Sequence, residues 1–407
     1  MSQIKQAFNS MDWILAGYIA AMIVVPRLAV VLLVGASIWI VIKYLPDLWN
    51  RSVSRSIILA VFLFLLWTII STLMSGHLSR EWVHLLKVCS LLGAGIIILL
   101  HFSKPRIRIK EMPEGKLAPE YAYGVGAAVL AFAVGYALVN GDSLWGSYFM
   151  DPLTTLNTNA VMLSLLAWPT MVRTMQQPSL PVICLLSFVV IMLFFMSSGA
   201  ALVAIFLGLL VLVIRCVSGK RGGMFLALTA TILILLAPEI VGGVGAEKYM
   251  EPEVVNNSTS SIPYSSRHRM AMWAFATDKI YEKPWLGWGF GASRYIPQED
   301  YRLADNMEVL PLHPHNLALQ TRLELGLPGS LILATLTFLV FYRLATFTEN
   351  AWHSGLAMAP AACWLFVANV SYGMWQSWWI ATAFLLFVIM RIALASVSES
   401  EKKPSEN

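Results

Sequence analysis

The sequence predicts an all-α polytopic membrane protein with about twelve transmembrane helices and one large external loop. Residues of the apolar class make up 58% of the 407 residues and charged residues only 13%, which favours successive spans over one water-surrounded core. A hydrocarbon core of about 30 Å takes about 20 apolar residues per helix, and stretches of that kind recur along the chain. These stretches lack the alternation of barrel strands, so we expect helices.

Twelve apolar stretches are candidate spans, of which the first two are short. They are residues 12–25, 28–44, 56–75, 82–102, 121–139, 155–171, 179–196, 200–216, 223–240, 328–345, 355–371 and 377–394. The first ends at Pro26-Arg27 without a small-residue cleavage site, so we expect it to remain as a helix rather than to be removed as a signal peptide.

The distribution of basic residues predicts the orientation of these spans. With the amino terminus in the cytoplasm, every major basic loop lies inside, as the positive-inside rule requires. These loops hold Lys43, Arg51, Arg55, the cluster from Lys104 to Lys116, Arg173, Arg215, Lys220 and Arg221. The predicted parts are helices one to nine in residues 1–240, an external loop in 241–327, helices ten to twelve in 328–395 and a disordered cytoplasmic tail in 396–407.

Charge and cysteine content exclude several classes of protein. The net charge of +5 comes largely from the cytoplasmic anchors, which indicates attraction to anionic membrane lipids rather than to nucleic acid. All four cysteines, Cys89, Cys184, Cys216 and Cys363, lie in or at the ends of spans. The external loop therefore has no disulfide framework, and no Cys/His spacing predicts a zinc site.

The external loop carries its own structural signals. Apolar residues recur at near-helical spacing from Arg269 to Tyr281, which predicts an amphipathic helix on the outer membrane surface, ended by Pro284. The Gly/Trp run Trp285–Gly291 follows. It is typical of a closely packed re-entrant turn, and a phosphate-binding nest is the alternative.

His315 is the leading candidate for chemistry, because it lies near the start of the tenth span and a histidine there titrates near neutrality. It could remove a proton from an attacking hydroxyl, or it could be an ordinary satisfied polar residue. Asn316 is placed to cap the helix or to hold substrate. His313 and His315 lack a third ligand at metal-site spacing, so we expect no metal.

Two further groups near this motif are candidates for substrate binding. Helical spacing from His315 places Arg322 on the same face and Glu324 on the opposite one, although Arg322 could equally snorkel to the membrane surface. Arg267 and Arg269 open the amphipathic helix, where they could grip phosphate or anchor the chain to anionic lipid.

A basic stripe lies at the outer end of the fourth span. His77, Arg80, His84 and Lys87 fall on one helix face, with neither Asp nor Glu on that face. Lys87 lies inside the apolar run, where a charge is expensive unless it is paired. A lipid-linked pyrophosphate would satisfy this stripe.

The motif His315-Asn316, nine residues, Gly326-x-x-Gly329, together with Arg269 to Trp273 and Pro284-x-x-Gly287-x-Gly289, resembles the bacterial O-antigen ligase and polymerase superfamily, of the membrane glycosyltransferase type called GT-C. The resemblance implies an inverting, metal-independent and cofactor-free glycosyltransferase of the inner membrane. Such an enzyme moves a glycan from undecaprenyl pyrophosphate to an acceptor hydroxyl on the periplasmic side, so the external loop would be periplasmic.

Within this superfamily, the chain's length favours the ligase, whose acceptor is lipid A-core, over the larger protein O-oligosaccharyltransferases. The repeat-unit polymerase is the close competitor. From other classes, a flippase for lipid-linked glycans would need polar residues along a midplane path, whereas most ionisable groups here cluster at the two membrane surfaces. A lipid-binding scaffold would leave His315 expendable.

The chain departs from the superfamily at Ser197-Ser198-Gly199, where many relatives carry Ser-Arg-Gly and use the arginine to hold phosphate. We therefore expect the basic stripe to supply that charge. The resulting hypothesis is that Arg80, Lys87 and Arg269 hold the donor pyrophosphate while His315 takes the acceptor proton. The role of His313 beside His315 stays open.

Overall fold

The computed structural model describes residues 25–49, 55–76, 78–102, 152–176, 198–256, 259–298 and 308–400, and the single positions 187, 191 and 193. Within these ranges the regular elements are helices and no β-strand occurs. The predicted all-α class is confirmed for this part of the chain.

Six of the described helices are long and apolar enough to cross a membrane. They are α3 (Arg55–Ser75), α4 (Leu78–Phe102, apolar from Glu81), α8 (Gly199–Leu235), α12 (Leu317–Thr346), α13 (Ala351–Ala368) and α14 (Ser377–Ser400, apolar to Leu394). Two more helices accompany them, α2 (Leu28–Trp49) and α6 (Pro152–Gln176). The predicted spans at 12–25, 121–139 and 179–196 lie almost entirely outside the described residues, so the number twelve stays a prediction.

Helix α8 contains two of the predicted spans, because it is broken at Gly219. This residue has φ 58° and ψ −144°, which no helix accommodates. A Cβ on Gly222 would lie 2.7 Å from the carbonyl oxygen of Ile214. Eight residues of continuous helix would separate these positions by about 12 Å, so the two halves of α8 fold back on each other.

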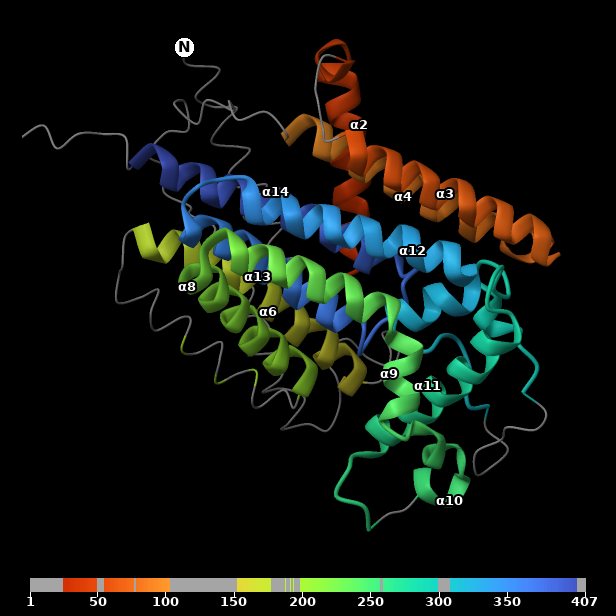
Figure 1. Ribbon diagram of the computed structural model, residues 1–407. Coiled ribbons are helices and arrows are strands. Elements are labelled where there is room, and N and C mark those ends of the chain that lie inside the picture. Colours follow the sequence, from red (N-terminus) through yellow and green to blue (C-terminus); the bar gives the residue numbers. More distant parts are fainter. Residues whose placement is uncertain are drawn as a thin grey trace, which may run out of the picture.

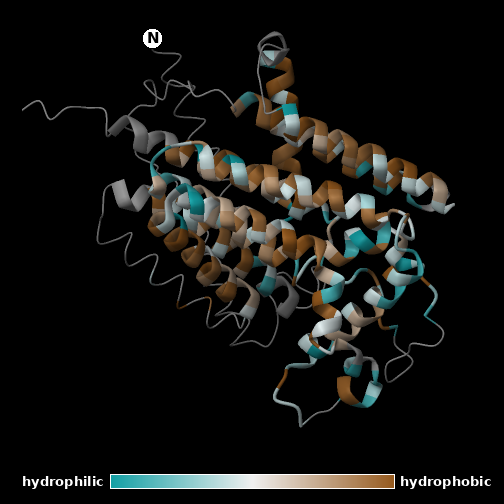
Figure 2. Ribbon diagram, in the orientation of Figure 1, coloured by the Kyte–Doolittle hydropathy of each residue, from teal (hydrophilic) through white to brown (hydrophobic). Residues whose placement is uncertain are grey.

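The long helices form one bundle (Figure 1). Helix α8 packs against α12 and α13, α14 packs against α2, α4 and α6, and α3 packs against α12. Figure 2 shows that the bundle is largely hydrophobic, whereas the segment that begins with α9 is mixed. Large apolar side chains such as Phe62 and Phe206 stay exposed on the outside of the bundle, as expected for contact with lipid.

The segment between α8 and α12 lies at one end of the bundle (Figure 1). It contains α9 (Ala237–Gly243), the 3₁₀ helix η2 (Ala246–Met250), α10 (Pro252–Val255), α11 (Tyr264–Glu282) and the 3₁₀ helix η3 (Ala292–Arg294).

The helix predicted from Arg269 to Tyr281 is present as α11, but its burial does not follow the single apolar face expected of a helix on the membrane surface. The helix starts earlier, at Tyr264, and Ala271 and Phe275 are fully buried while Tyr281 is exposed. Buried residues occupy several sides of α11, because it packs against α9, α10, η2 and α12 rather than lying on a surface by one face.

Helix α12 is broken at Gly326, which has φ 64° and ψ −163°. A Cβ there would lie 2.1 Å from the carbonyl oxygen of Trp285. The Gly/Trp run is therefore in backbone contact with α12. Its amides also satisfy the last carbonyls of the part of α12 that precedes Gly326, because Trp288 N–H donates to Leu323 O over 2.9 Å and Gly289 N–H to Glu324 O over 2.8 Å. The prediction of a packed turn is confirmed.

The predicted start of the disordered tail at 396 is wrong, because α14 continues to Ser400. Once a helix has formed, each added residue gains a hydrogen bond at little further cost, so a polar end can prolong it. Residues 401–407 lie outside the described part.

Candidate active site

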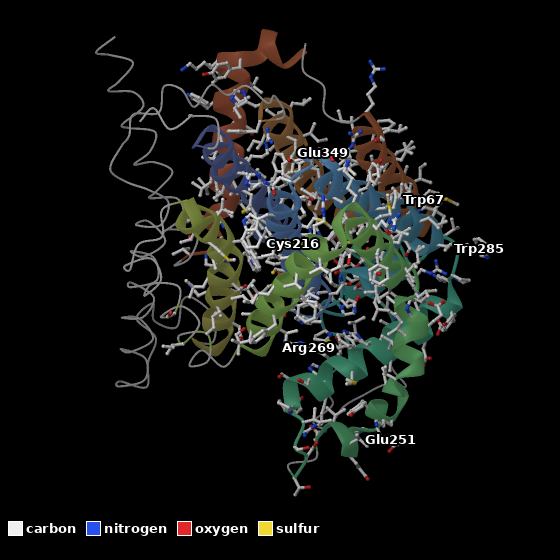
Figure 3. The ribbon with its side chains drawn as sticks, turned by 60° about the vertical axis from the view of Figure 1, so that its left-hand side comes forward. Trp67, Cys216, Glu251, Arg269, Trp285 and Glu349 are labelled. Atoms are coloured by element: carbon white, nitrogen blue, oxygen red, sulfur yellow. The ribbon has the colours of Figure 1, made fainter. Side chains whose placement is uncertain are left out.

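A cavity of about 1420 Å³ opens where the bundle meets the segment of α9 to η3. Its lining includes the cations Arg27, Lys87, Arg269 and Arg294, the histidines His84, His313 and His315, and the acid Glu324. In Figure 3, Arg269 lies where α11 approaches the end of the bundle, and Glu251 lies at the far end of the same segment. Residues from distant parts of the sequence thus share one space.

His315 lies in the turn just before α12, in a strained backbone conformation. With φ 52°, it is the one non-glycine residue with a positive φ among the described residues. Its Nδ1 lies 2.6 Å from the carbonyl oxygen of Ser371, in the turn before α14. A carbonyl only accepts hydrogen bonds, so Nδ1 carries the proton and Nε2 is the unprotonated nitrogen of the neutral ring.

The surroundings of His315 keep this ring neutral. Burial is the main cause that lowers the pKa of His315; the charges of Arg269 and His268 lower it further, and the hydrogen bond to Ser371 opposes them. At neutral pH the lone pair of Nε2 is therefore available to accept a proton, as a general base requires.

His313 lies beside His315 and has both ring nitrogens engaged. The ring centroids are 4.3 Å apart, the His315 N–H donates to His313 Nδ1 over 3.3 Å, and the Gln376 amide lies 3.4 Å from His313 Nε2. Burial, His315 and Arg294 lower the pKa of His313 to about 3. His313 lines the cavity, and its contacts with His315 and Gln376 are those of a support for His315. Its proposed part in substrate binding stays a prediction.

Arg269 extends from α11 toward the same cavity and is half-buried. Burial lowers the pKa of its guanidinium, and Tyr372 opposes this shift. Among the described residues, no carboxylate lies within ion-pair distance of Arg269, Arg294 or Lys87. Three cations thus share one cavity without an acidic partner in the described part of the chain.

Arg267 and Asn316, both predicted to bind substrate, serve the protein instead. Arg267 is buried and donates from Nε to Val255 O over 2.8 Å and from Nη1 to Ile262 O over 2.6 Å. Asn316 accepts the Leu319 N–H with its side-chain oxygen over 2.9 Å, which is the capping role considered above. Neither residue lines the cavity.

The predicted pairing of His315 with Arg322 is wrong in geometry. Helix α12 begins at Leu317, after the left-handed residue His315, so helical spacing counted from His315 does not apply. Glu324 lines the cavity and Arg322 does not, and the ionisable groups near Arg322 are Glu239 and Tyr281.

The basic stripe is only partly as predicted. His84 and Lys87 line the cavity, His77 lies outside the described residues, and the side chain of Arg80 is likewise outside them. The expected absence of an acidic neighbour is wrong, because Glu81 Oε2 lies 3.0 Å from His84 Nδ1. Residues three apart on a helix are neighbours, so Glu81 belongs to the same group.

Sequence reasoning missed Arg27, Arg294 and Glu324 as lining residues. Arg294 lies in an irregular stretch where no periodicity predicts a direction, and Glu324 was assigned to the wrong face. Glu324 is fully buried and accepts four hydrogen bonds, from Gly291 N–H, Ser293 Oγ, Gln320 Nε2 and Trp375 Nε1 over 2.5 to 3.1 Å. Ser198, which stands where many relatives carry an arginine, also lines the cavity. The positive charges beside it come from other elements, among them Lys87 of the basic stripe.

In the described ranges, no group of three or more His, Cys, Asp or Glu side chains is arranged to hold a metal ion. Metal independence stays a prediction. The EDTA arm of the assay described below tests it.

Comparison with known proteins shows similarity to one family. Residues 182–334 match the sequence profile of a family described as O-antigen ligase, a stretch that includes α8, α11, Arg269 and His315. This stretch of the chain is thus similar to the O-antigen ligase family. With six apolar helices of spanning length among its described residues, the chain is a multi-pass membrane protein.

Similar proteins come from rickettsiae and are provisionally named polysaccharide ligases. The Rickettsia conorii protein is 28% identical over 343 residues, 81% of this chain and 78% of the relative. The Rickettsia typhi protein is 28% identical over 339 residues, 81% of this chain and 79% of the relative. The Rickettsia prowazekii protein is 34% identical over 152 residues, 36% of each chain.

Proposed function

We propose that this protein is an inverting, metal-independent O-antigen ligase of the bacterial inner membrane. It transfers a glycan from undecaprenyl pyrophosphate to a hydroxyl of lipid A-core. The observation that carries the proposal is His315: a neutral histidine, held through Nδ1 by Ser371 O. It shares its cavity with Lys87, Arg269 and Arg294, none of which has a carboxylate partner among the described residues.

In the proposed reaction, His315 Nε2 takes the proton of the acceptor hydroxyl while the oxygen attacks the anomeric carbon of the donor. The bond from that carbon to the phosphate oxygen breaks, and its electron pair leaves with undecaprenyl pyrophosphate. Arg269 stabilises the charge that develops on this leaving group. Attack opposite the leaving group inverts the anomeric centre.

The remaining lining of the cavity supports a lipid-linked donor. Apolar side chains from four helices face the same space as the cations, among them Val30 of α2, Val161 of α6, Val203 of α8 and Phe366 of α13. A prenyl pyrophosphate combines a long apolar chain with a compact anion, and this cavity offers a surface for each.

We also infer that the cavity faces the periplasm. The two halves of α8 meet at Gly219, at the end of the bundle remote from the segment of α9 to η3 (Figure 1). Arg215, Lys220 and Arg221 lie at this turn, and basic residues favour the cytoplasmic side.

The test is reconstitution of the purified protein with undecaprenyl-pyrophosphate-linked glycan and lipid A-core, with the products separated on a gel. We expect a shifted lipid A-core band that survives EDTA. Longer lipid-linked chains would instead identify a repeat-unit polymerase. Absence of any glycan transfer, to lipid A-core or to a second lipid-linked glycan, would reject the proposal and favour a flippase.

His315→Ala tests the assigned role in the same assay. General-base catalysis typically contributes about 10² to 10⁴ in rate, so we expect a loss of that size with donor binding retained. His353→Ala, which removes a histidine at the opposite end of α13 from the cavity, is the matched control and should transfer normally. Equal loss of donor binding and transfer in His315→Ala would contradict the base assignment.

A further inference from the structure

We propose that Arg294 holds the pyrophosphate of the donor, and that two buried carboxylates, Glu81 and Glu324, fix the stretch Gly291–Tyr295 that presents it. This inference rests on the proposed function and adds a binding residue to it. We call Gly291–Tyr295 the arginine loop.

The first carboxylate fixes the start of the arginine loop. Glu324 of α12 accepts the Gly291 N–H through Oε2 over 2.8 Å and the Ser293 hydroxyl through Oε1 over 2.5 Å. Its remaining acceptor capacity is used by Gln320 and Trp375. Because Glu324 is completely buried and satisfied by four donors, it holds the loop and has little capacity left for Arg294.

The second carboxylate fixes the end of the loop. Glu81 of α4 is buried and accepts the Tyr295 hydroxyl through Oε1 over 2.8 Å and pairs with His84 through Oε2. Gly291 packs directly against it, since a Cβ at this residue, which has φ 71°, would lie 2.5 Å from Glu81 Oε2. The loop is thus held between α4 and α12.

Arg294 is the residue of this loop that is left to a ligand. Its side chain is exposed and lines the cavity, while Gly291, Ala292 and Ser293 beside it are buried. No hydrogen-bond or ion-pair partner of its guanidinium occurs among the described residues. Because the loop is fixed before binding, only the side chain of Arg294 has to become ordered for its guanidinium to grip phosphate in two places.

The position of Arg294 also fits the proposed reaction. Its charge acts on His313, whose ring lies 4.3 Å from that of His315. A pyrophosphate bound between Arg294 and Arg269 would therefore lie next to the proposed base. Lys87, in the same lining, adds a third positive charge without a second fork.

The experiment measures equilibrium binding of undecaprenyl pyrophosphate and of undecaprenyl monophosphate to the full-length protein in detergent, through quenching of tryptophan fluorescence. Trp375 and Trp378 line the cavity and would report occupancy. We expect wild type to prefer the pyrophosphate. Arg294→Ala should weaken pyrophosphate binding roughly tenfold to a hundredfold and reduce the preference.

Two matched variants control this result. Lys220→Ala removes one positive charge at the Gly219 turn, where Lys220 pairs with Glu349, and should bind as wild type does. Arg294→Lys keeps the charge without the fork and should fall between wild type and Arg294→Ala.

The role of the carboxylates has its own readout. The double variant Ser293→Ala/Tyr295→Phe removes both side-chain hydrogen bonds from the loop to the two acids and leaves the backbone bond from Gly291 N–H to Glu324. It should therefore weaken pyrophosphate binding, and adding Arg294→Ala to it should cost less than Arg294→Ala costs in wild type. Full additivity would mean that the acids do not position Arg294.

The outcomes separate the inference from the function. Wild-type affinity in folded Arg294→Ala, with weakened binding in Arg269→Ala, would overturn the inference and leave the proposed function standing. Absence of binding of either lipid by wild type would overturn both. Should Arg294→Ala fail to fold, wild-type affinity in Arg294→Lys would also overturn the assignment of the fork.

Discussion

The two ends of the bundle each contain a helix broken at a glycine, but the two breaks have different structural consequences. At Gly219 in α8, φ is 58°, and apart from the adjoining chain no atom of the described residues lies within 4 Å of a Cβ placed there. At Gly326 in α12, φ is 64° and the carbonyl oxygen of Trp285 lies 2.1 Å from that position. The first glycine only reverses the chain, whereas the second lets another stretch of backbone reach the helix.

The arginines at the two ends differ in the same way. Arg215, near Gly219, is fully buried and donates from Nε to Ser354 Oγ over 3.0 Å and from Nη2 to Ala345 O over 3.1 Å. Arg269, at the other end, reaches the cavity without an acidic partner among the described residues. The arginine near Gly219 is thus satisfied by the protein's own groups, whereas under the proposed function the anionic ligand is the partner of Arg269.

The largest effect on stability should come from Gly326→Ala set against Gly219→Ala. Both changes put a Cβ on a backbone of positive φ that only glycine adopts readily, which costs about 1 to 3 kcal/mol. Gly326→Ala must also push Trp285 away and break backbone bonds such as Leu327 N to Pro284 O, for a total above about 3 kcal/mol. Thermal unfolding in detergent measures both variants, and equal shifts would remove the distinction between the two breaks.

Smaller effects should separate Arg269→Ala, which we expect to impair donor binding, from Arg215→Ala, which we expect to impair stability. Losing Arg215 leaves buried acceptors at Ser354 and Ala345 without their donor, so the melting temperature should fall, by an amount equivalent to roughly 1 to 3 kcal/mol. Losing Arg269 should leave the melting temperature nearly unchanged but raise the KM for donor roughly tenfold to a hundredfold.

Arg267→Ala is the control within the same helix. Because Arg267 donates to Val255 O and Ile262 O, its loss should behave like that of Arg215. A large loss of stability in Arg269→Ala would show that Arg269, too, is a structural residue.

The smallest effect concerns pH. Because the pKa of His315 is lowered by burial, the ring stays neutral at every pH above that lowered value. We expect kcat/KM for donor to change little from pH 8 to about 6.5, the ordinary histidine pKa, and to fall only at lower pH, where His315 becomes protonated.

Unfolding must be followed across the same pH series, because an unfolded histidine binds protons below about 6.5 and so draws the protein toward the unfolded state. A fall in kcat/KM centred above pH 6.5, in protein that remains folded, would contradict a neutral, buried base.

Much of the fold was predictable because apolar runs are local signals. The span predicted at 56–75 appears as α3, Arg55–Ser75, within one residue. It was harder to predict which side of a helix faces the cavity. Arg267 and Arg269 are two residues apart, which turns them about 200° from each other on α11, and no local pattern tells which one faces a cavity.

The cavity itself depended on contacts that sequence spacing does not encode. His315 was found through its motif, but the start of α12 at Leu317 decided that Glu324 rather than Arg322 reaches the lining. Arg294 required knowledge of where an irregular loop runs between α4 and α12. Long-range packing, not propensity, determines these positions.

The partners of His315 and Glu324 also bear on how the protein is made. His315 leaves the ribosome before Ser371, and Glu324 before Trp375, yet each depends on the later residue for a hydrogen bond. A nascent chain therefore cannot hold its histidine in the working tautomer until the turn before α14 has been synthesised and α14 has entered the membrane. Chains truncated before that turn should be inert, so that only fully inserted copies would consume lipid-linked glycan.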